Sequence, residues 1–186
     1  MAKEKKSYKT KLKNVRLAFP SLYETEKFNG EDTGKYAATF MLHKKEHKEL
    51  IEEIKEKFEE IKEEYGVKKL KEDKTCLTDG EDFDTDSDIT IDYYFLKASN
   101  RRRPLLIDRD KSPLTEEDDK FYPGCRVNAV IDFWFQDNEY GKRINANLLG
   151  VQFARDDERF GGGAVADIDD FDEVEYEDDF EDDDEL

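Results

Sequence analysis

Hydrophobic and polar residues alternate along several stretches of the chain with the two-residue period of a β-strand. In residues 8–19, Val15, Leu17 and Phe19 fall on one face and Arg16 falls on the other. Alternation of this kind is typical of a strand with one buried face. We therefore predict a strand here, with its apolar face toward a core.

Similar patterns predict further strands at residues 35–42, at 91–98 and, more briefly, at 105–108. The two longest runs, 124–136 and 142–153, are separated by a short polar turn that contains Gly141, which is typical of a β-hairpin. In the first of these runs two faces separate clearly. The apolar face carries Cys125, Val127, Ala129, Ile131, Phe133 and Phe135, and the other carries Arg126, Asn128, Asp132 and Trp134.

One stretch has the helical period instead. Apolar residues recur at spacings of 4, 4, 3 and 4 on a surface of Lys and Glu, and Gly66 follows as a stop signal. The predicted helix covers residues 43–65. Its apolar stripe consists of Leu50, Ile54, Phe58, Ile61 and Tyr65.

The remaining internal segments, residues 20–34, 67–90 and 109–123, are polar and are predicted to be loops. The order of elements is then two strands, a helix and four strands. We predict a mainly β fold with one inserted helix, arranged as a partly open antiparallel barrel similar to the OB-fold.

Charge divides the chain into two parts. Residues 161–186 follow directly on Phe160, begin with three glycines, and contain 14 Asp and Glu but no Lys or Arg. The other 160 residues hold 35 acidic and 31 basic residues, although the net charge of the whole chain is −18. We predict a domain at 1–160 and a disordered acidic tail at 161–186.

Several classes of protein lack support in the sequence. No apolar run approaches the roughly 20 residues that a membrane span needs, and the basic N-terminus lacks the apolar stretch of a signal peptide. Cys76 and Cys125 have no CxxC spacing, so neither a disulfide framework nor a zinc site is expected. We expect a cytoplasmic protein, in the bacterial host cell, without a cofactor or a membrane partner. A homodimer is compatible with the sequence.

Two short motifs resemble metal sites. His43, Glu46 and His47 match the H-x-x-E-H signature of zinc peptidases, but no second helix is evident to supply a third ligand. The aspartate-rich run at 82–88 resembles a calcium loop. It places Ile89 and Phe95 where glycine and glutamate are required. We interpret the first motif as accidental and keep a metal-dependent hydrolase only as a rival function. The second does not form an EF-hand and is a plain acidic loop or, alternatively, a loose cation site.

Cations and aromatic rings share the predicted strands and their loops. Proteins that bind single-stranded nucleic acid combine cations, which follow the phosphates, with rings on which bases stack. Trp134 is open to two interpretations, a stacking platform or a core residue, and the adjacent guanidiniums of residues 101–103 favour an anionic ligand. The candidate DNA-binding residues are Lys11, Lys13, Arg16, Tyr94, Lys97, Arg101, Arg102, Arg103, Arg126, Trp134, Tyr140, Lys142 and Arg143.

Hydrophobic residues interrupt the acidic tail at intervals. Pure solubilisation does not require them, so we favour a tail that docks onto a protein partner or onto the protein's own DNA groove. The candidate partner-binding residues are Phe171, Tyr176, Phe180 and Leu186. A DNA mimic, whose carboxylates imitate phosphates, is the alternative function. The clustered arginines argue against it.

Four stretches in order resemble phage-encoded single-stranded DNA-binding proteins, long classified as a family of unknown function. They are NVRLAFPSLY (14–23), KYAATFMLH (35–43), YFLKASNRRRP (94–104) with Ile107 and Asp108, and the segment 122–124. The resemblance spans residues 12–154. It implies an OB-fold, no catalysis, and sequence-independent binding of single strands in phage DNA replication or recombination. It also implies that the tail contacts replication proteins of the phage or host.

Overall fold

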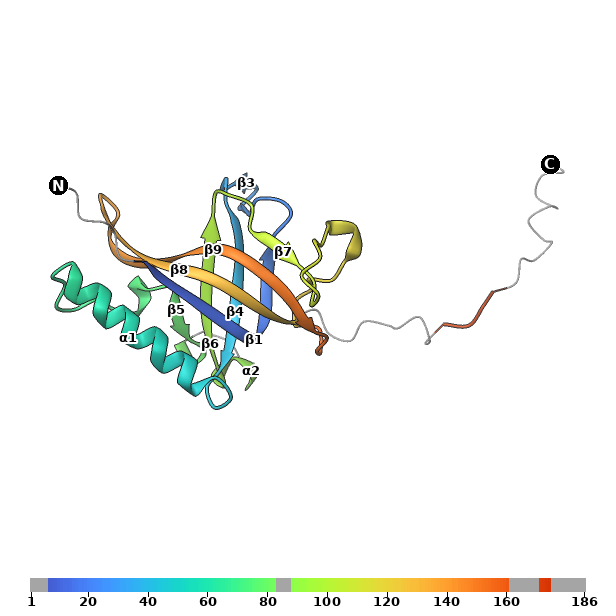
Figure 1. The fold of residues 1–186 in the computed structure, drawn as a ribbon, viewed down its shortest axis with the longest axis horizontal. Helices are drawn as coiled ribbons and strands as arrows, with labels where there is room; N and C mark the ends of the chain where they lie inside the picture. Colours follow the sequence, from blue (N-terminus) through green and yellow to red (C-terminus); the bar gives the residue numbers. More distant parts are fainter. Residues whose placement is uncertain (1–6, 83–87, 161–170, 175–186) are drawn as a thin grey trace.

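The computed structural model describes residues 7–82, 88–160 and 171–174 of the chain, and its centre is a five-stranded β-barrel (Figure 1). The strands are β1 (Tyr8–Ser21), β4 (Tyr36–His43), β6 (Tyr93–Asn100), β8 (Arg126–Asn138) and β9 (Gly141–Arg155). They follow each other around the barrel in the order β1-β4-β6-β9-β8, and β8 returns to β1. This is the strand order of an OB-fold, the fold predicted from the sequence.

The predicted antiparallel arrangement holds for every strand contact of the barrel except one. Strand β6 meets β9 in parallel orientation, at Ser99 and Asn147, and this contact closes the barrel. A short strand, β7 (Leu105–Ile107), also runs parallel to β9 on the outside (Figure 1). Sequence alternation fixes the faces of a strand but carries no information on the direction of its neighbour.

Alternating side chains of the barrel strands form the core. Leu17, Phe40, Leu96, Ile131 and Leu148 have no exposed surface, and the predicted apolar face of β8 is buried up to Phe133.

Phe19 departs from the predicted apolar face of β1 and is 73% exposed. Its φ of +46° and a register shift between Ala18 and Ser21 break the alternation of the strand. A β-bulge of this kind re-aims one side chain without ending the strand.

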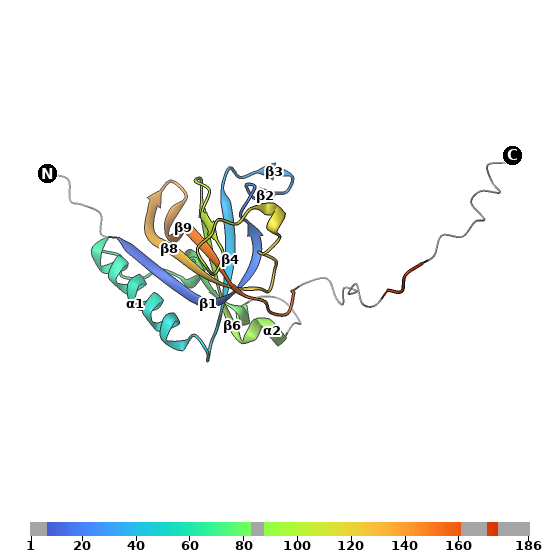
Figure 2. The same ribbon diagram turned by 45° about the vertical axis from the view of Figure 1, so that its right-hand side comes forward.

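Helix α1 (Lys48–Glu64) packs across one side of the barrel (Figures 1 and 2). It begins later than predicted, because the backbone N–H groups of Lys45 and Glu46 donate to Nδ1 of His43 and hold residues 44–47 in a turn. The buried stripe is consequently Ile51, Ile54, Phe58 and Ile61. Leu50 is half-buried at its edge.

The segment predicted as a loop at 67–90 contains regular structure, which corrects the prediction. It holds η1 (Glu72–Lys74), η2 (Gly80–Asp82), α2 (Asp88–Ile91), and β5 (Leu77–Asp79), which pairs with β6. A β-carbon on Gly80 would lie 1.7 Å from the carbonyl oxygen of Thr90, so only glycine allows this close packing. The many acidic residues of the segment obscure the alternation of apolar and polar positions that would predict its short strand.

The other connections are also partly structured. The first predicted loop contains a two-stranded hairpin, β2 (Lys27–Phe28) and β3 (Glu31–Asp32), and η3 (Glu116–Asp118) lies between β7 and β8.

Candidate nucleic-acid interface

A cleft of about 650 Å³ lies on the outside of the barrel where β6 approaches the β8–β9 hairpin. The loop after β3 and the segment before β5 complete its walls. Side chains from distant parts of the chain meet here. They include Lys35, Asp73, Lys97, Ser99, Arg101, Trp134, Gln136, Arg143, Asn145 and Asn147.

Four cations line the cleft. Among them, Lys97 forms a salt bridge with Glu26 at 3.2 Å, and its side chain is still 58% exposed. Arg143 donates to the backbone oxygen of Asp73 at 3.4 Å. Within the part of the chain that the structure describes, Lys35 and Arg101 have no salt bridge. The cleft therefore carries an excess of positive charge available to an anionic ligand.

Trp134 lies in the cleft and not in the core, which excludes the interpretation of its position as a core residue. Its side chain is 40% exposed on the outer face of β8, opposite Asn145 of β9. Amides surround it, and Nδ2 of Asn145 donates to Oε1 of Gln136 at 2.8 Å. A flat ring beside amides and cations offers stacking and hydrogen bonding together.

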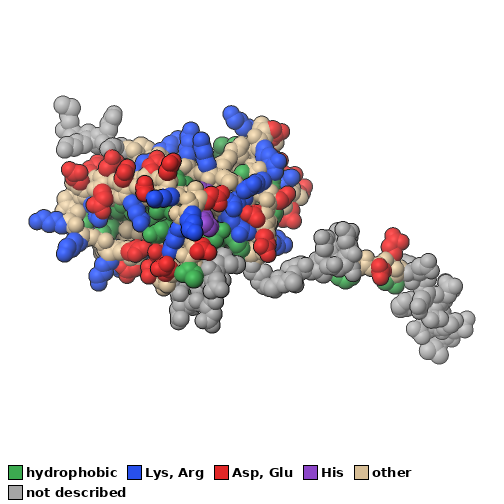
Figure 3. All heavy atoms as spheres, turned by 90° about the horizontal axis from the view of Figure 1, so that it is seen from below, with side chains coloured by type: hydrophobic (Ala, Val, Ile, Leu, Met, Phe, Trp, Pro, Cys, Tyr) green, Lys and Arg blue, Asp and Glu red, His purple; other side chains and the backbone are tan. Residues whose placement is uncertain are grey.

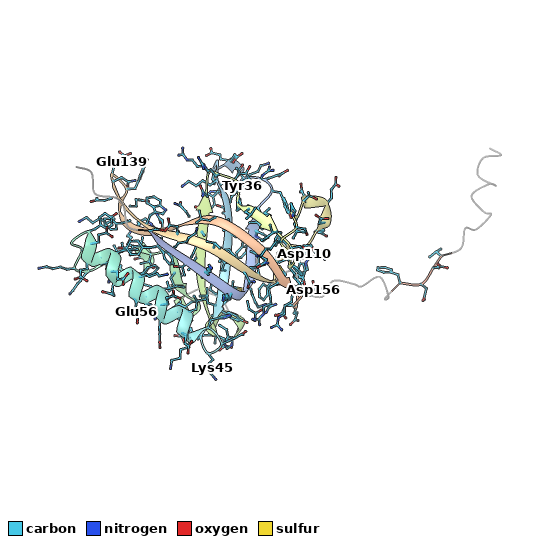
Figure 4. The ribbon with its side chains drawn as sticks, in the orientation of Figure 1. Tyr36, Lys45, Glu56, Asp110, Glu139 and Asp156 are labelled. Carbon is cyan, nitrogen blue, oxygen red and sulfur yellow. The ribbon has the colours of Figure 1, made fainter. Side chains whose placement is uncertain are left out.

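The tip of the hairpin extends this surface. Tyr140 is 79% exposed and Lys142 is exposed, and Glu139 between the strands marks the tip in Figure 4. The hairpin rests on α1, because the ring of Phe135 stacks on Tyr65 with a centroid distance of 4.6 Å. The helix thus supports one wall of the cleft.

The three consecutive arginines have different environments. Arg101 lines the cleft, whereas Arg102 is exposed beside it. Arg103 turns away, donates to the backbone oxygen of Tyr23 at 3.2 Å, and lies 5.7 Å from the ring centroid of Tyr36. Arg103 therefore holds the loop after β1 against the start of β4.

Tyr94 is not part of the cleft, contrary to its inclusion among the candidates. Its hydroxyl accepts a hydrogen bond from Nζ of Lys55 at 2.9 Å, and its ring packs between β6 and α1. It lines a different hollow, together with Phe58 and Leu77. The side chain therefore supports the helix.

Arg16 and Arg126 are engaged inside the protein, which is a further correction. Arg16 is only 8% exposed, and its Nε donates to the oxygen of Gly124 at 3.1 Å. Arg126 donates to Asp157 at 2.8 Å and to Glu46 at 2.9 Å. Because both guanidiniums are committed to protein partners, neither is available to phosphates.

These two arginines fasten the chain after β9 to the barrel. The Arg16 guanidinium lies 3.8 Å from the ring centroid of Phe160 and 3.5 Å from Asp157. The hydrogen bond from Arg126 holds the pKa of the Asp157 carboxyl below its usual value. We call Arg16, Arg126, Asp157 and Phe160 the arginine clamp. Asp156, which precedes Asp157 of the clamp in the sequence, is labelled in Figure 4.

Lys11 and Lys13 lie outside the cleft. They point outward from β1, and both border a smaller hollow against β8. In the described parts of the chain neither forms a salt bridge.

The H-x-x-E-H motif has a structural role. Nδ1 of His47 accepts from the backbone N–H of His43 at 3.0 Å, and Nε2 faces the backbone oxygen of Asn14 at 3.0 Å. Glu46 pairs with Arg126. Both ring nitrogens of His47 thus have backbone partners. Residues 83–87, the middle of the aspartate-rich run, lie outside the described residues.

Sequence reasoning missed part of the cleft. Lys35 was not selected, nor were Ser99, Asn145 and Asn147. The alternation of residues 142–153 places Asn145 and Asn147 on the outer face, so a search for outward amides on predicted strands could have found both. Lys35 and Ser99 gave no such signal.

A closed barrel whose outer strands and loops form a cationic cleft defines an OB-fold binding protein, the class that holds oligonucleotides or oligosaccharides in this position. The family model described as the single-stranded DNA-binding protein of Enterobacter phage Enc34 matches residues 8–181. The chain belongs to this family of phage single-stranded DNA-binding proteins.

The chain is also similar to individual phage proteins. A putative protein p50 from Acyrthosiphon pisum secondary endosymbiont phage 1 is 41% identical over 176 residues, covering 89% of this chain and 94% of that protein. The single-stranded DNA-binding protein from bacteriophage Enc34, solved in complex with single-stranded DNA, is 32% identical with a TM-score of 0.74, over 87% of this chain and 97% of that one.

A more distant structure shares the fold alone. The single-stranded DNA-binding protein gp2.5 of bacteriophage T7 is 13% identical with a TM-score of 0.53, covering 88% of this chain and 99% of that one. In the described residues no helix is long and apolar enough to cross a membrane.

Proposed function

We propose that this protein binds single-stranded DNA without sequence preference and that the cleft is its main binding site. The observation that carries the proposal is the meeting of four cations and a partly exposed tryptophan in one cleft of an OB barrel. Cations follow the phosphates of any sequence, and every base has a face that can stack. The likeness to a phage protein solved with single-stranded DNA supports it.

The cleft favours a binding protein over the rival functions. A DNA mimic presents carboxylates and has no use for a cleft lined by Lys35, Lys97, Arg101 and Arg143. A metal-dependent hydrolase would need His47, whose ring nitrogens already have backbone partners. One face of the molecule shows Lys and Arg interspersed with Asp and Glu (Figure 3). A hollow between β1 and the start of α1 likewise combines lysines with Glu46, Glu49 and Glu53, whereas the cleft is lined by four cations. We therefore assign a non-enzymatic role.

A salt titration tests the proposal. Oligo(dT) and a duplex of equal length are compared by fluorescence anisotropy at several salt concentrations. We expect the single strand to bind more tightly, because stacking requires unpaired bases. Log K should fall with log salt at a slope of about −0.7 per phosphate contact, or roughly −3 for four contacts. Equal or tighter duplex binding at every salt concentration would refute the stacking role.

We also propose that the protein functions in phage DNA replication or recombination, in the cytoplasm of the host. In this proposal the acidic tail has a role of its own. The tail competes with DNA for the domain and recruits replication proteins. Its carboxylates and the cations of the domain attract each other, which supports the competition. Of the four candidate anchors, Phe171 is described and is 72% exposed. Tyr176, Phe180 and Leu186 lie outside the described residues.

A further inference from the structure

A second hollow lies on the outer face of the barrel, between β1, β8, β9 and β7. We call it the trough and define it by Lys11, Lys13, Leu105, Ile107, Val130 and Gly150. Its volume is about 250 Å³, enough for an aromatic side chain but not for a stretch of nucleic acid. Leu105 is 64% exposed at its edge.

Gly150 lines the trough where β7 approaches β9. A β-carbon there would lie 3.3 Å from the backbone oxygen of Leu105 and 3.5 Å from its Cβ. Strand β7 can therefore lie close to β9, and the space above Gly150 stays open with an apolar lining. Exposed apolar surface in a concave position is typical of a docking site.

Two lysines border this apolar floor. Lys11 and Lys13 occupy successive outward positions of β1 and are therefore about 6.8 Å apart along the strand. Lys11 is the register partner of Val130, so its side chain borders the trough directly. Neither lysine has a salt bridge among the described residues. The site fits an apolar side chain with carboxylates next to it.

The chain itself contains such a segment. Residues 171–174 read Phe-Asp-Glu-Val, and the side chains of Phe171 and Val174 are 72% and 92% exposed. An aromatic ring followed by two carboxylates matches an apolar floor bordered by two lysines.

The segment is within reach of the trough. The arginine clamp fixes Phe160, whose backbone N–H also donates to the oxygen of Pro123 at 2.9 Å. Phe171 is eleven residues after Phe160, so the two lie at most about 36–40 Å apart along an extended chain. Gly150 is ten residues before Phe160, so it lies no more than about 33–36 Å from the clamp by the same rule.

We propose that Phe171 packs into the trough while Asp172 and Glu173 face Lys11 and Lys13. This inference deepens the proposed function, on which its consequence for DNA rests. Val130 and Trp134 lie on the outer face of the same strand, about 14 Å apart. A DNA strand that leaves the cleft along β8 therefore meets the docked tail, whereas a strand confined to the cleft does not.

Paramagnetic NMR on the full chain tests the docking without DNA. A nitroxide is attached to the variant Val174→Cys. Cys125 is buried, and the partly exposed Cys76 is replaced by serine so that it takes no label. We expect the strongest broadening of amide signals around Lys11, Val130 and Leu105. Broadening centred on Trp134 and Arg101, or none at all, would overturn the proposal.

Two further variants test the two sides of the docking contact. Phe171→Ser removes the docking ring, and Leu105→Glu places a negative charge at an exposed position of the trough. Each should reduce the broadening at least threefold while leaving the amide spectrum of the barrel otherwise unchanged. Undiminished broadening in both variants would contradict the docking. If broadening appears only between labelled and unlabelled chains in a mixed sample, the intramolecular assignment is wrong.

DNA of different lengths tests the consequence. Phe171→Ser should raise the affinity for a long oligo(dT) severalfold at low salt and leave the affinity for an oligonucleotide of four bases unchanged. Equal gains at both lengths would place the competition in the cleft and overturn the proposal. Absence of DNA binding by every variant would instead refute the proposed function, while the NMR result would stand independently.

Discussion

Arg101 and Arg102 are neighbours in sequence, but only Arg101 lines the cleft. The pair therefore allows a matched comparison of two arginines. Replacement of Arg101 by alanine should lower the affinity for all single-stranded sequences alike and reduce the salt slope by about 0.7, the value of one phosphate contact. Arg102→Ala should change both quantities less. Salt titrations of the two variants make the measurement, and indistinguishable effects would contradict the placement of the cleft.

Trp134 offers a test of stacking. Its replacement by alanine should cost about 1–3 kcal/mol of binding free energy. Because the side chain is 40% exposed, the melting temperature should change little. Trp134→Phe keeps a flat ring and should retain most of the affinity. A large fall in melting temperature with unchanged affinity would show that the ring matters for packing instead.

At the scale of the elements, the turn between β4 and α1 depends on a buried imidazole. His47 is 8% exposed, and burial lowers the pKa of its side chain below the ordinary value of 6.5. The unfolded chain therefore binds this proton more readily than the folded one, so the free energy of unfolding should fall as the pH drops below about 6.5. Above that pH this contribution is fully present.

Denaturant unfolding between pH 5 and pH 8 measures this effect. His47→Gln removes the titrating group, so the variant should lose less stability between pH 7.5 and pH 5.5 than the wild type. The comparison concerns the slopes and not the absolute stabilities, because the substitution also alters hydrogen bonds to His43 and Asn14. Parallel curves for the two proteins would rule out His47 as the group responsible.

Charge is separated along the chain. The 14 carboxylates of residues 161–186 follow a domain with a cationic cleft, and 26 residues with the dimensions of a random coil have a root-mean-square reach of about 25–30 Å. The tail can therefore reach its own domain at high effective concentration. Truncation after Phe160 should raise the affinity for single-stranded DNA, most at low salt, because salt screens the competition. It should also abolish binding to replication proteins.

Binding isotherms of the full and truncated chains at two salt concentrations check the first expectation. As a control, Tyr176→Ser and Phe180→Ser keep every charge of the tail and should weaken partner binding more than self-competition. If the truncated protein binds no more tightly at low salt, the tail acts on partners only or merely solubilises the domain.

The sequence alone determined the elements whose faces are set by local periodicity. The apolar face of β8 and the middle of the helical stripe of α1, from Ile54 to Ile61, follow from spacing, because each element must bury one side. It also determined the separation of an acidic tail from a near-neutral domain. Periodicity failed where the backbone departs from regularity, as at Phe19, where a positive φ turns the ring outward.

Only the tertiary structure decided which cations are available to a ligand. Arg16, Arg126 and Arg101 look alike on the sequence, yet Arg16 and Arg126 pair with Asp157, which lies 141 and 31 residues away along the chain. Arg101 meets Trp134 and Arg143 because β6 closes on the hairpin in parallel. Whether a charged side chain is available to a ligand depends on such long-range contacts, and these form only when the barrel closes.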